Sequence, residues 1–196
     1  GNKKMRLSQP QHIMAAEREI IEEAYAGDII GVFDPGIFSI GDTITVPGKK
    51  FRFSGIPTFE PEHFMTARPK DTMKRKQFIK GIEQIAREGA IQIFKNPALG
   101  MEEAIIGVVG TLQFDVFRYR MLNEYGVELV MTGLPYEHLR FIIECPGDPL
   151  KLDLANGCKV LEDYRGNFVI VFSGIWALNY IEKQNPGLVL SDELRV

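Results

Sequence analysis

Residues 110–135 read GTLQFDVFRYRMLNEYGVELVMTGLP, and this stretch decides the fold of the chain. Thr111 can cap a helix, and Gly126 stands where a left-handed glycine ends one. A β-branched run follows over residues 127–130, and a short apolar run over residues 104–109 precedes the cap. The stretch therefore predicts a strand, a helix and a second strand, joined by tight connections.

The helix predicted here has apolar side chains at helical spacing. One face is formed by Leu112, Val116, Tyr119 and Leu122, with Phe117, Met121 and Tyr125 beside it. Such a helix is expected to pack on a sheet. We expect the core beneath it to contain Leu112, Phe117, Leu122, Ile91, Ile93, Ile106 and Val108.

Upstream of this stretch, residues 62–69 suit a strand. Asp71 can cap a helix that runs to about Glu88 and ends at Gly89. Its apolar stripe consists of Phe78, Ile79, Ile82, Ile85 and Ala86. Residues 90–95 form the next predicted strand, and residues 96–101 a loop. The element order is then βαββαβ, the split-βαβ or ferredoxin-like arrangement, with two helices on one face of a sheet.

The same order recurs towards the C-terminus. Residues 139–145 indicate a strand, and residues 148–156 a short helix that Gly157 stops. Residues 159–163 and 167–172 indicate a hairpin around Arg165 and Gly166. Ser173 can cap a last helix reaching about Gln184, and residues 188–190 would close the sheet. We expect two related α/β subdomains joined near Pro135, or alternatively a second lobe that shares one core with the first.

The N-terminal part has another character. Residues 29–33, 43–46 and 51–54 are strand candidates, separated by the turn signals Asp-Pro-Gly at 34–36 and Pro-Gly at 47–48. After Gly27 this part shows no helical period of adequate length. It is therefore predicted to be a β module.

The stretch quoted first also carries a family pattern. Its positions are Gly110, Leu112, Phe114, Arg120, Glu124, Tyr125, Val127 and Glu128. This pattern resembles the third domain of elongation factor G among the translational GTPases. The form Leu-Gln-Phe-Asp-Val at 112–116 is closer to the class II peptide chain release factors. Residues 23–31, 40–43, 53–62, 76–81 and 88–94 resemble segments of the same family, in the expected order.

The resemblance covers nearly the whole chain and implies an α+β fold. A partial translation-factor β-barrel would be followed by tandem βαββαβ subdomains, ferredoxin-like and similar to domain III of elongation factor G. Residues 1–57 would be the C-terminal part of the barrel, domain II. Residues 58–135 and 136–196 would be the first and second halves of domain III.

A translational GTPase needs a phosphate loop, Gly-x-x-x-x-Gly-Lys-[Ser/Thr]. The nearest approach runs from Gly41 to Lys49, but six residues separate its two glycines and Lys50 stands where Ser or Thr is required. The resemblance therefore implies a C-terminal fragment without its GTPase domain and without catalysis of its own. No cofactor or metal is expected in this fragment. GTP or GDP and magnesium would be bound by the missing domain.

For the complete protein, the resemblance implies a bacterial cytoplasmic GTPase of translation termination that promotes dissociation and recycling of class I release factors. This part would dock on the ribosome and transmit the nucleotide state. The implied partners are ribosomal RNA and ribosomal proteins, class I release factors, and the GTPase domain of the parent chain. Two alternatives stay open: a fragment of an elongation factor G-like translocase, and a stand-alone ferredoxin-like module that binds a regulatory metabolite.

Composition limits the possible chemistry. The chain has 196 residues, is 45% hydrophobic with 13 Phe, and carries a formal net charge of -3. Its overall charge does not indicate nucleic-acid binding, so any RNA contact must be local. The sequence shows no membrane-spanning run and no signal-peptide pattern. Cys145 and Cys158 have no metal-type spacing, the three histidines are scattered, and no catalytic residues are expected.

One local feature remains. Basic residues concentrate where the helix after Asp71 begins, at Lys70, Lys74, Arg75, Lys76 and Lys80. Cations at a helix N-terminus oppose the macrodipole, so helix stability does not explain them. Contact with ribosomal RNA phosphates would explain them, because it needs positive charge rather than base reading. The alternative is a solvated helix face with internal ion pairs. Arg118 and Arg120 are further surface candidates.

Overall fold

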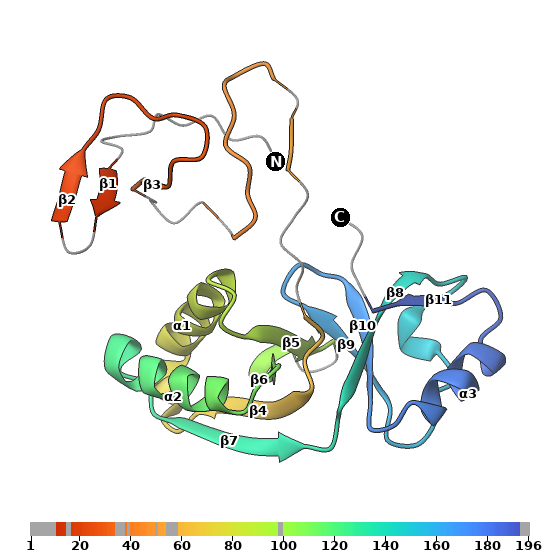
Figure 1. Ribbon diagram of the computed structural model, residues 1–196. Helices are drawn as coiled ribbons and strands as arrows, with labels where there is room; N and C mark the ends of the chain where they lie inside the picture. Colours follow the sequence, from red (N-terminus) through yellow and green to blue (C-terminus); the bar gives the residue numbers. More distant parts are fainter. Residues whose placement is uncertain are drawn as a thin grey trace. The chain divides into compact units, whose positions relative to one another are not determined.

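The structure is a computed structural model that describes residues 11–14, 17–33, 38, 40–49, 51–53, 59–97 and 100–192. The chain divides into two compact units, Gly1–Gly55 and Ile56–Val196. The described residues combine antiparallel sheets with few helices, which makes the chain mixed α and β (Figure 1). Within this described part, no helix has the length and apolar character needed to cross a membrane.

The first unit contains a small antiparallel sheet with the order β2-β1-β3. Its strands are β1 (Gln11–Met14), β2 (Glu17–Ile20) and β3 (Ile30–Gly31). The strand predicted over residues 29–33 therefore shrinks to two residues. The turn predicted at Pro47-Gly48 is formed, because the Lys49 amide donates to the Val46 carbonyl at 3.3 Å. The turn predicted at 34–36 lies outside the described residues.

The strands predicted over residues 43–46 and 51–54 are not formed in the described residues 43–46 and 51–53. A strand requires a ladder of backbone hydrogen bonds to a neighbour. Here the Phe53 amide instead donates a hydrogen bond to the Thr43 hydroxyl oxygen, at 3.1 Å. A side-chain acceptor does not continue into a ladder, so these segments stay irregular.

The second unit is built on one sheet with the order β11-β8-β10-β9-β5-β6-β4-β7. Its pairings are antiparallel. The first four strands in the chain are β4 (His63–Pro69), β5 (Gln92–Asn96), β6 (Gly100–Val108) and β7 (Leu129–Leu134). The last four are β8 (His138–Glu144), β9 (Lys159–Asp163), β10 (Phe168–Phe172) and β11 (Val189–Ser191). Counted from its own outer edge of the sheet inwards, each set has the order fourth, first, third and second strand. The two sets meet where β5 pairs with β9.

Two helices, α1 (Arg75–Arg87) and α2 (Leu112–Tyr125), lie side by side against the first set of strands (Figure 1). A short 3-10 helix, η1 (Thr72–Lys74), precedes α1, and Asp71 caps it by accepting from the Met73 amide. Gly126 ends α2 with a φ of 64°, the left-handed conformation that was predicted for it. Helix α3 (Trp176–Gln184) accompanies the second set of strands.

Two predicted caps are wrong. Thr111 precedes α2 but its side chain makes no capping bond, and α3 begins after Ile175 rather than at Ser173. Before α2 the Gln113 side chain instead binds the backbone that leads into the helix. Its oxygen accepts from the amides of Val109 and Gly110, each at 3.0 Å, and its nitrogen donates to the Ala90 carbonyl.

The helix predicted over residues 148–156 is also wrong, since only the three-residue η2 (Pro149–Lys151) forms there. Leu152 is already extended, with a ψ of 141°. The Asn185 side chain then binds both backbone groups of Asp153, accepting from its amide and donating to its carbonyl, each at 2.9 Å. These bonds replace the helical ones that Asp153 would otherwise need.

The first core lies between α1, α2 and the sheet. It contains Ile91, Ile93, Ile106, Val108 and Phe117 as predicted, together with Phe78, Ile82, Ile85, Phe114 and Met121. Leu112 and Leu122 do not belong to it, because they are 72% and 52% exposed. Helix α2 carries two apolar stripes on opposite faces, and the face with Phe114, Phe117 and Met121 is the buried one. The prediction combined residues of both stripes, with Phe117 right and Leu112 and Leu122 wrong, because both stripes have helical spacing.

Two further cores complete the unit. One gathers side chains from the helix-free faces of both sets of strands, namely Phe64, Phe94, Ile105, Leu139, Leu161, Val169 and Val171. The other lies under α3 and includes Ile170, Phe172, Ala177 and Ile181. Because the first of these clusters draws on both sets, the two sets of strands share a core.

The segment before β4 is attached to this unit. The Glu60 carboxylate accepts from the Leu139 amide at 2.6 Å and from the Arg140 guanidinium at 2.7 Å. The Gln92 side chain donates to the Phe59 carbonyl at 2.8 Å. Residues 59–62 are therefore held by hydrogen bonds to β5 and β8.

Candidate functional site

The predicted basic cluster surrounds the start of α1. Lys70 follows β4, Lys74 ends η1, Arg75 begins α1, and Lys76 and Lys80 lie in its first two turns. Asp71 caps η1, and the first turn of α1 contains no acidic residue. The sequence thus places all five cations in one short region, but the structure gives them different environments.

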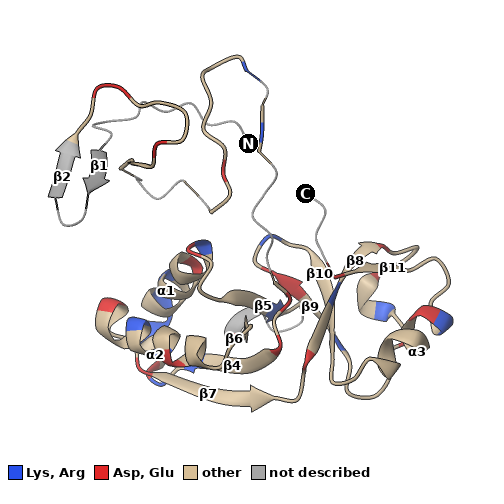
Figure 2. Ribbon diagram, in the orientation of Figure 1, with Lys and Arg blue, Asp and Glu red and all other residues tan. Residues whose placement is uncertain are grey.

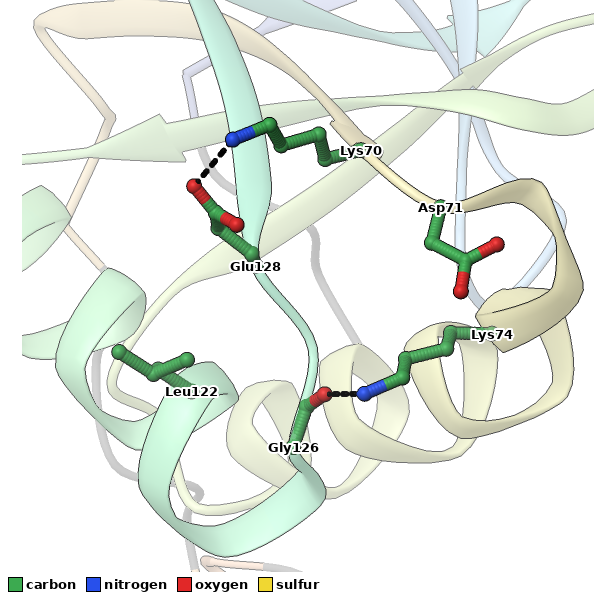
Figure 3. Close-up of a pocket in the computed structure, with 6 residues that line it drawn as sticks. All are labelled: Lys70, Asp71, Lys74, Leu122, Gly126 and Glu128. Atoms are coloured by element: carbon green, nitrogen blue, oxygen red, sulfur yellow. Dashed lines mark hydrogen bonds and ion pairs between the residues drawn. The ribbon is translucent and has the colours of Figure 1, made fainter.

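Two of the four lysines are engaged within the chain (Figure 3). Lys70 forms an ion pair with Glu128 at 2.8 Å, where the end of β4 lies beside the start of β7. Lys74 donates from its ammonium group to the Gly126 carbonyl at the end of α2. A cation near the C-terminus of a helix also interacts favourably with the helix dipole. Lys74 therefore stabilises the end of α2 while it opposes the dipole of α1.

An open hollow of about 430 Å³ lies between these side chains. Figure 3 shows Lys70 and Glu128 on one side of it, Lys74 and Gly126 on another, and Leu122 projecting from α2. Asp71 also lines it. The hollow thus combines one apolar side chain with two lysines and two carboxylates, which is mixed rather than basic.

Lys76 and Lys80 differ from Lys70 and Lys74. They are exposed, lie four residues apart on the outer face of α1, and have no hydrogen bond or ion pair to any residue that the structure describes. Glu83 and Arg87 continue the same exposed stripe, which therefore carries three cations and one acid (Figure 2). Sequence reasoning missed Arg87, although its spacing of eleven residues from Lys76 could have found it. Arg75 is exposed as well.

The two further arginine candidates lie on α2. Arg118 is exposed, whereas Arg120 bonds Glu124 at 2.7 and 2.8 Å and also forms an ion pair with Glu88 at the end of α1. Hydrogen bonds from Arg120 hold the pKa of Glu88 and that of Glu124 below the ordinary range, and Glu124 and Glu88 raise the pKa of Arg120. Arg120 therefore joins the two helices and is not a free cation.

Within the described part of residues 41–53, the backbone does not have the form of a phosphate loop. Residues 46–49 make a turn where a phosphate loop would lead into a helix, and the described residues 51–53 that follow are not helical. The described residues hold no group of three His, Cys, Asp or Glu side chains that could share a metal ion. Cys145 and Cys158 are unpaired and half-buried, and burial raises the pKa of the Cys158 thiol, which disfavours its thiolate.

Two family models match the chain. The model described as "Class II release factor RF3, C-terminal domain" covers residues 53–182, and the one described as "Elongation factor G domain 2" covers residues 1–47. The two matches do not overlap. The boundary between them lies close to the boundary between the two compact units.

Curated relatives agree with these models. The peptide chain release factor 3 of Symbiobacterium thermophilum is 50% identical over 187 residues, covering 95% of this chain and 35% of that protein. Those of Gloeobacter violaceus and Streptococcus pyogenes serotype M49 are 43% and 42% identical, each covering 96% of this chain. The chain thus spans little more than a third of the length of these relatives.

Proposed function

The chain belongs to the class II release factor RF3 family, and from that premise we propose that it is the C-terminal part of a translation termination GTPase. The complete protein promotes dissociation of class I release factors from the ribosome and recycles them in the cytoplasm. This part docks on the ribosome and relays the nucleotide state without catalysis of its own. The collinear match of two family models over residues 1–47 and 53–182 is the observation that carries this proposal.

The domain plan belongs to the same proposal. Residues 1–57 are the C-terminal part of a domain II barrel, and residues 58–135 and 136–196 are two related subdomains of domain III. The first has the ferredoxin-like order βαββαβ, and the second has the short η2 in place of its first helix. The shared strand order of β4–β7 and β8–β11 supports two related subdomains. The common core of Phe64, Phe94, Leu139 and Val169 indicates that the subdomains move together.

Transmission of the nucleotide state then occurs as rigid-body motion between units. The hydrogen bonds of Phe59 and Glu60 tie residues 59–62 to the second unit. Phe59 and Glu60 therefore move with the second unit. Breaking the bonds of Glu60 would lengthen the connection and weaken the coupling.

Ribosome contact is proposed for the basic cluster Lys70, Lys74, Arg75, Lys76 and Lys80, with unequal roles. Lys70 and Lys74 already have partners in Glu128 and Gly126, so they shape the surface. Lys76 and Lys80 are exposed and free to bind phosphate. Each phosphate that they neutralise releases counterions, so binding weakens as the salt concentration rises.

The test is ribosome binding of the complete parent protein over a salt series. The double variant Lys76→Glu, Lys80→Glu should bind more weakly and with a shallower salt slope, because fewer counterions are released. Its free nucleotide binding should not change. The matched control is Lys151→Glu, Lys183→Glu, which changes the net charge equally at exposed sites of η2 and α3.

Unchanged affinity and slope for the Lys76 and Lys80 variant would reject the RNA contact and leave a solvated helix face. An equal loss in the control variant would show a general charge effect instead. Substituting Lys70 and Lys74 should act differently, since it should first lower the stability of the second unit.

Nucleotide binding is proposed to lie outside this chain, in the domain that would carry the phosphate loop. Titration calorimetry of the chain with GTP or GDP and magnesium should therefore give no saturable heat. The complete parent protein is the positive control. Saturable micromolar binding by the chain alone would contradict this assignment.

A further inference from the structure

Residues 59–62, which lead into β4, form a strap across the second unit. On the side of the first set of strands, the Phe59 carbonyl accepts from the Gln92 side chain at 2.8 Å. The Glu62 amide donates to the Val108 carbonyl at 3.0 Å. The two ends of the strap are therefore bound to β5 and β6.

The middle of the strap binds the second set of strands. The Glu60 carboxylate accepts from the Leu139 amide at 2.6 Å and from the Arg140 guanidinium at 2.7 Å, both on β8. The same guanidinium donates to the Leu139 carbonyl at 2.7 Å and lies 6.0 Å from the centre of the Phe172 ring. Phe172 is fully buried in the core under α3. One carboxylate is thus connected, through Arg140, to the core of the second set.

The strap also has a seat on β6. Pro61 is buried, and its ring rests on Gly107. Gly107 lies between Ile106 and Val108, which belong to the first core, so it faces the helix-free side of the sheet. A Cβ atom at Gly107 would lie 3.0 Å from Cβ of Pro61 and 2.9 Å from the Phe94 ring. Because Gly107 has no left-handed φ, the seat of Pro61 and the Phe94 ring require a glycine here, and the backbone does not.

The strap joins strands that are not neighbours. In the order of the sheet, β10, β9 and β5 separate β8 from β6. Two consecutive residues of the strap nevertheless contact both, because Glu60 binds β8 and Pro61 rests on β6. The common core on the helix-free faces brings the two sets close enough for this. A displacement of the strap therefore acts on β8 directly, without passing through the strands between.

We propose that Glu60 is a positioning residue for the relay of the nucleotide state, an inference that rests on the proposed function. The strap follows the boundary between the two compact units, so a displacement that reaches the second unit along the chain passes through it. Glu60 transfers this displacement to β8 through the Leu139 amide and Arg140. Both subdomains then follow together. Without Glu60 the strap would hold only the first set of strands.

Hydrogen exchange of the complete parent protein tests the contact. Glu60→Ala removes the acceptor of the Leu139 amide. This amide should then exchange at least roughly tenfold faster, because a hydrogen bond to a charged group is lost. Glu60→Gln keeps a carbonyl oxygen for the Leu139 amide and should restore much of the protection.

The matched control is Glu162→Ala. Glu162 forms a similar ion pair with Lys95 at 2.7 Å, but this pair joins β5 and β9, which are already neighbours in the sheet. The exchange of the Leu139 amide should therefore stay unchanged in this variant. Unchanged exchange in Glu60→Ala as well would overturn the inference.

The relay itself is measured as the dissociation of a class I release factor from termination complexes, driven by the parent protein and GTP. Glu60→Ala should slow this dissociation at least about fivefold, the lower end of the usual coupling between sites. Glu60→Gln should retain more of the rate. The affinities of the Glu60→Ala protein for GTP and for the ribosome should not change, which separates lost positioning from lost folding.

Faster exchange at Leu139 with an unchanged dissociation rate would overturn the inference, because Glu60 would then only stabilise the fold. An equal slowing by Glu162→Ala would also overturn it, since the loss of any carboxylate in this unit would suffice. The proposed function fails on a different result, namely a parent protein that does not speed dissociation at all. An active parent protein that is indifferent to Glu60→Ala contradicts this inference alone.

Discussion

Helices α1 and α2 are neighbours of nearly equal length on the same face of the sheet, and they differ in what they show to the outside. Helix α1 buries Phe78, Ile82 and Ile85 and exposes charges, as a surface helix of a globular protein does. Helix α2 buries Phe114, Phe117 and Met121 and exposes a second apolar stripe. The same sheet therefore positions one charged outer surface and one apolar outer surface.

The comparison shows that burial is decided by neighbours and not by hydrophobicity alone. Leu112 and Leu122 are as apolar as the residues of the inner face, yet no helix or strand among the described residues of the second unit covers them. The two aromatic rings on the inner face fill the space above the strands. Four predictions can break or sharpen this contrast, and they are ordered by the size of the expected effect.

Phe117→Ala should have the largest effect. Phe117 is 1% exposed in the core between α2 and the sheet, and its truncation leaves a cavity. We expect a loss of about 3–5 kcal/mol in the free energy of unfolding. Urea denaturation of the second unit measures this loss. The dependence of the free energy of unfolding on urea concentration should not change. A loss below about 1 kcal/mol would show that the inner face of α2 is not the buried one.

Gly81→Ala should have the second largest effect, because Gly81 lies where α1 contacts α2. A Cβ atom there would lie 2.7 Å from the Met121 sulfur and 2.9 Å from Cγ of Tyr125. Overpacking costs about 1–3 kcal/mol, and the better helix propensity of Ala offsets about 1 kcal/mol of it.

The matched control for this change is Gln77→Ala, on the exposed side of α1. It should leave the free energy of unfolding within about 0.5 kcal/mol of the parent. Adding Met121→Ala to Gly81→Ala should cost less than the sum of the two single changes, because the smaller side chain vacates the space. Strict additivity would argue against the close contact.

Arg120→Met should have a smaller effect, which depends on pH. The change removes the hydrogen bonds that lower the pKa of Glu88 and of Glu124. A carboxyl group whose pKa is lowered by folding stabilises the folded state when the pH is above the ordinary glutamate pKa. That stabilisation is lost as the pH falls through the lowered pKa of the folded state. The two proteins should therefore differ in stability at neutral pH and converge in acid, once the pH lies below the lowered pKa values of Glu88 and Glu124. A difference that persists in acid would point to lost packing of the arginine stem.

Leu122→Ala should have the smallest effect in the 196-residue chain, within about 0.5 kcal/mol, because Leu122 is exposed on the outer face. Thermal unfolding of the chain with and without the substitution measures this difference. A loss as large as that of Phe117→Ala would show that the outer stripe of α2 is covered.

Local patterns predicted much of the second unit. Gly89 and Gly126 occupy the helix ends that the sequence indicated, and the apolar stripe of α1 is buried as expected. Asp71 caps the short η1 that precedes α1 rather than α1 itself. The order of strands and helices between His63 and Leu134 also agrees with prediction. These features depend on backbone geometry and on period within one segment, and both are readable from neighbouring residues.

The errors concern contacts between distant segments. Residues 148–156 were predicted as a helix, but the Asn185 side chain, far along the chain, binds the backbone of Asp153 instead. The strand predicted at residues 43–46 needed a ladder partner that the described residues do not supply. Propensity cannot reveal such partners, because they come from tertiary structure.

The candidate site divides in the same way. By itself, the sequence determined that five cations gather where α1 begins, that α2 carries two apolar stripes, and that no phosphate loop is present. Only the tertiary structure decided that Lys70 and Lys74 are bound to Glu128 and Gly126, and that Lys76 and Lys80 are left to the surface. It also decided which stripe of α2 faces the sheet. The physical reason is that charge and period belong to a segment, whereas partners and burial belong to whatever the fold brings against it.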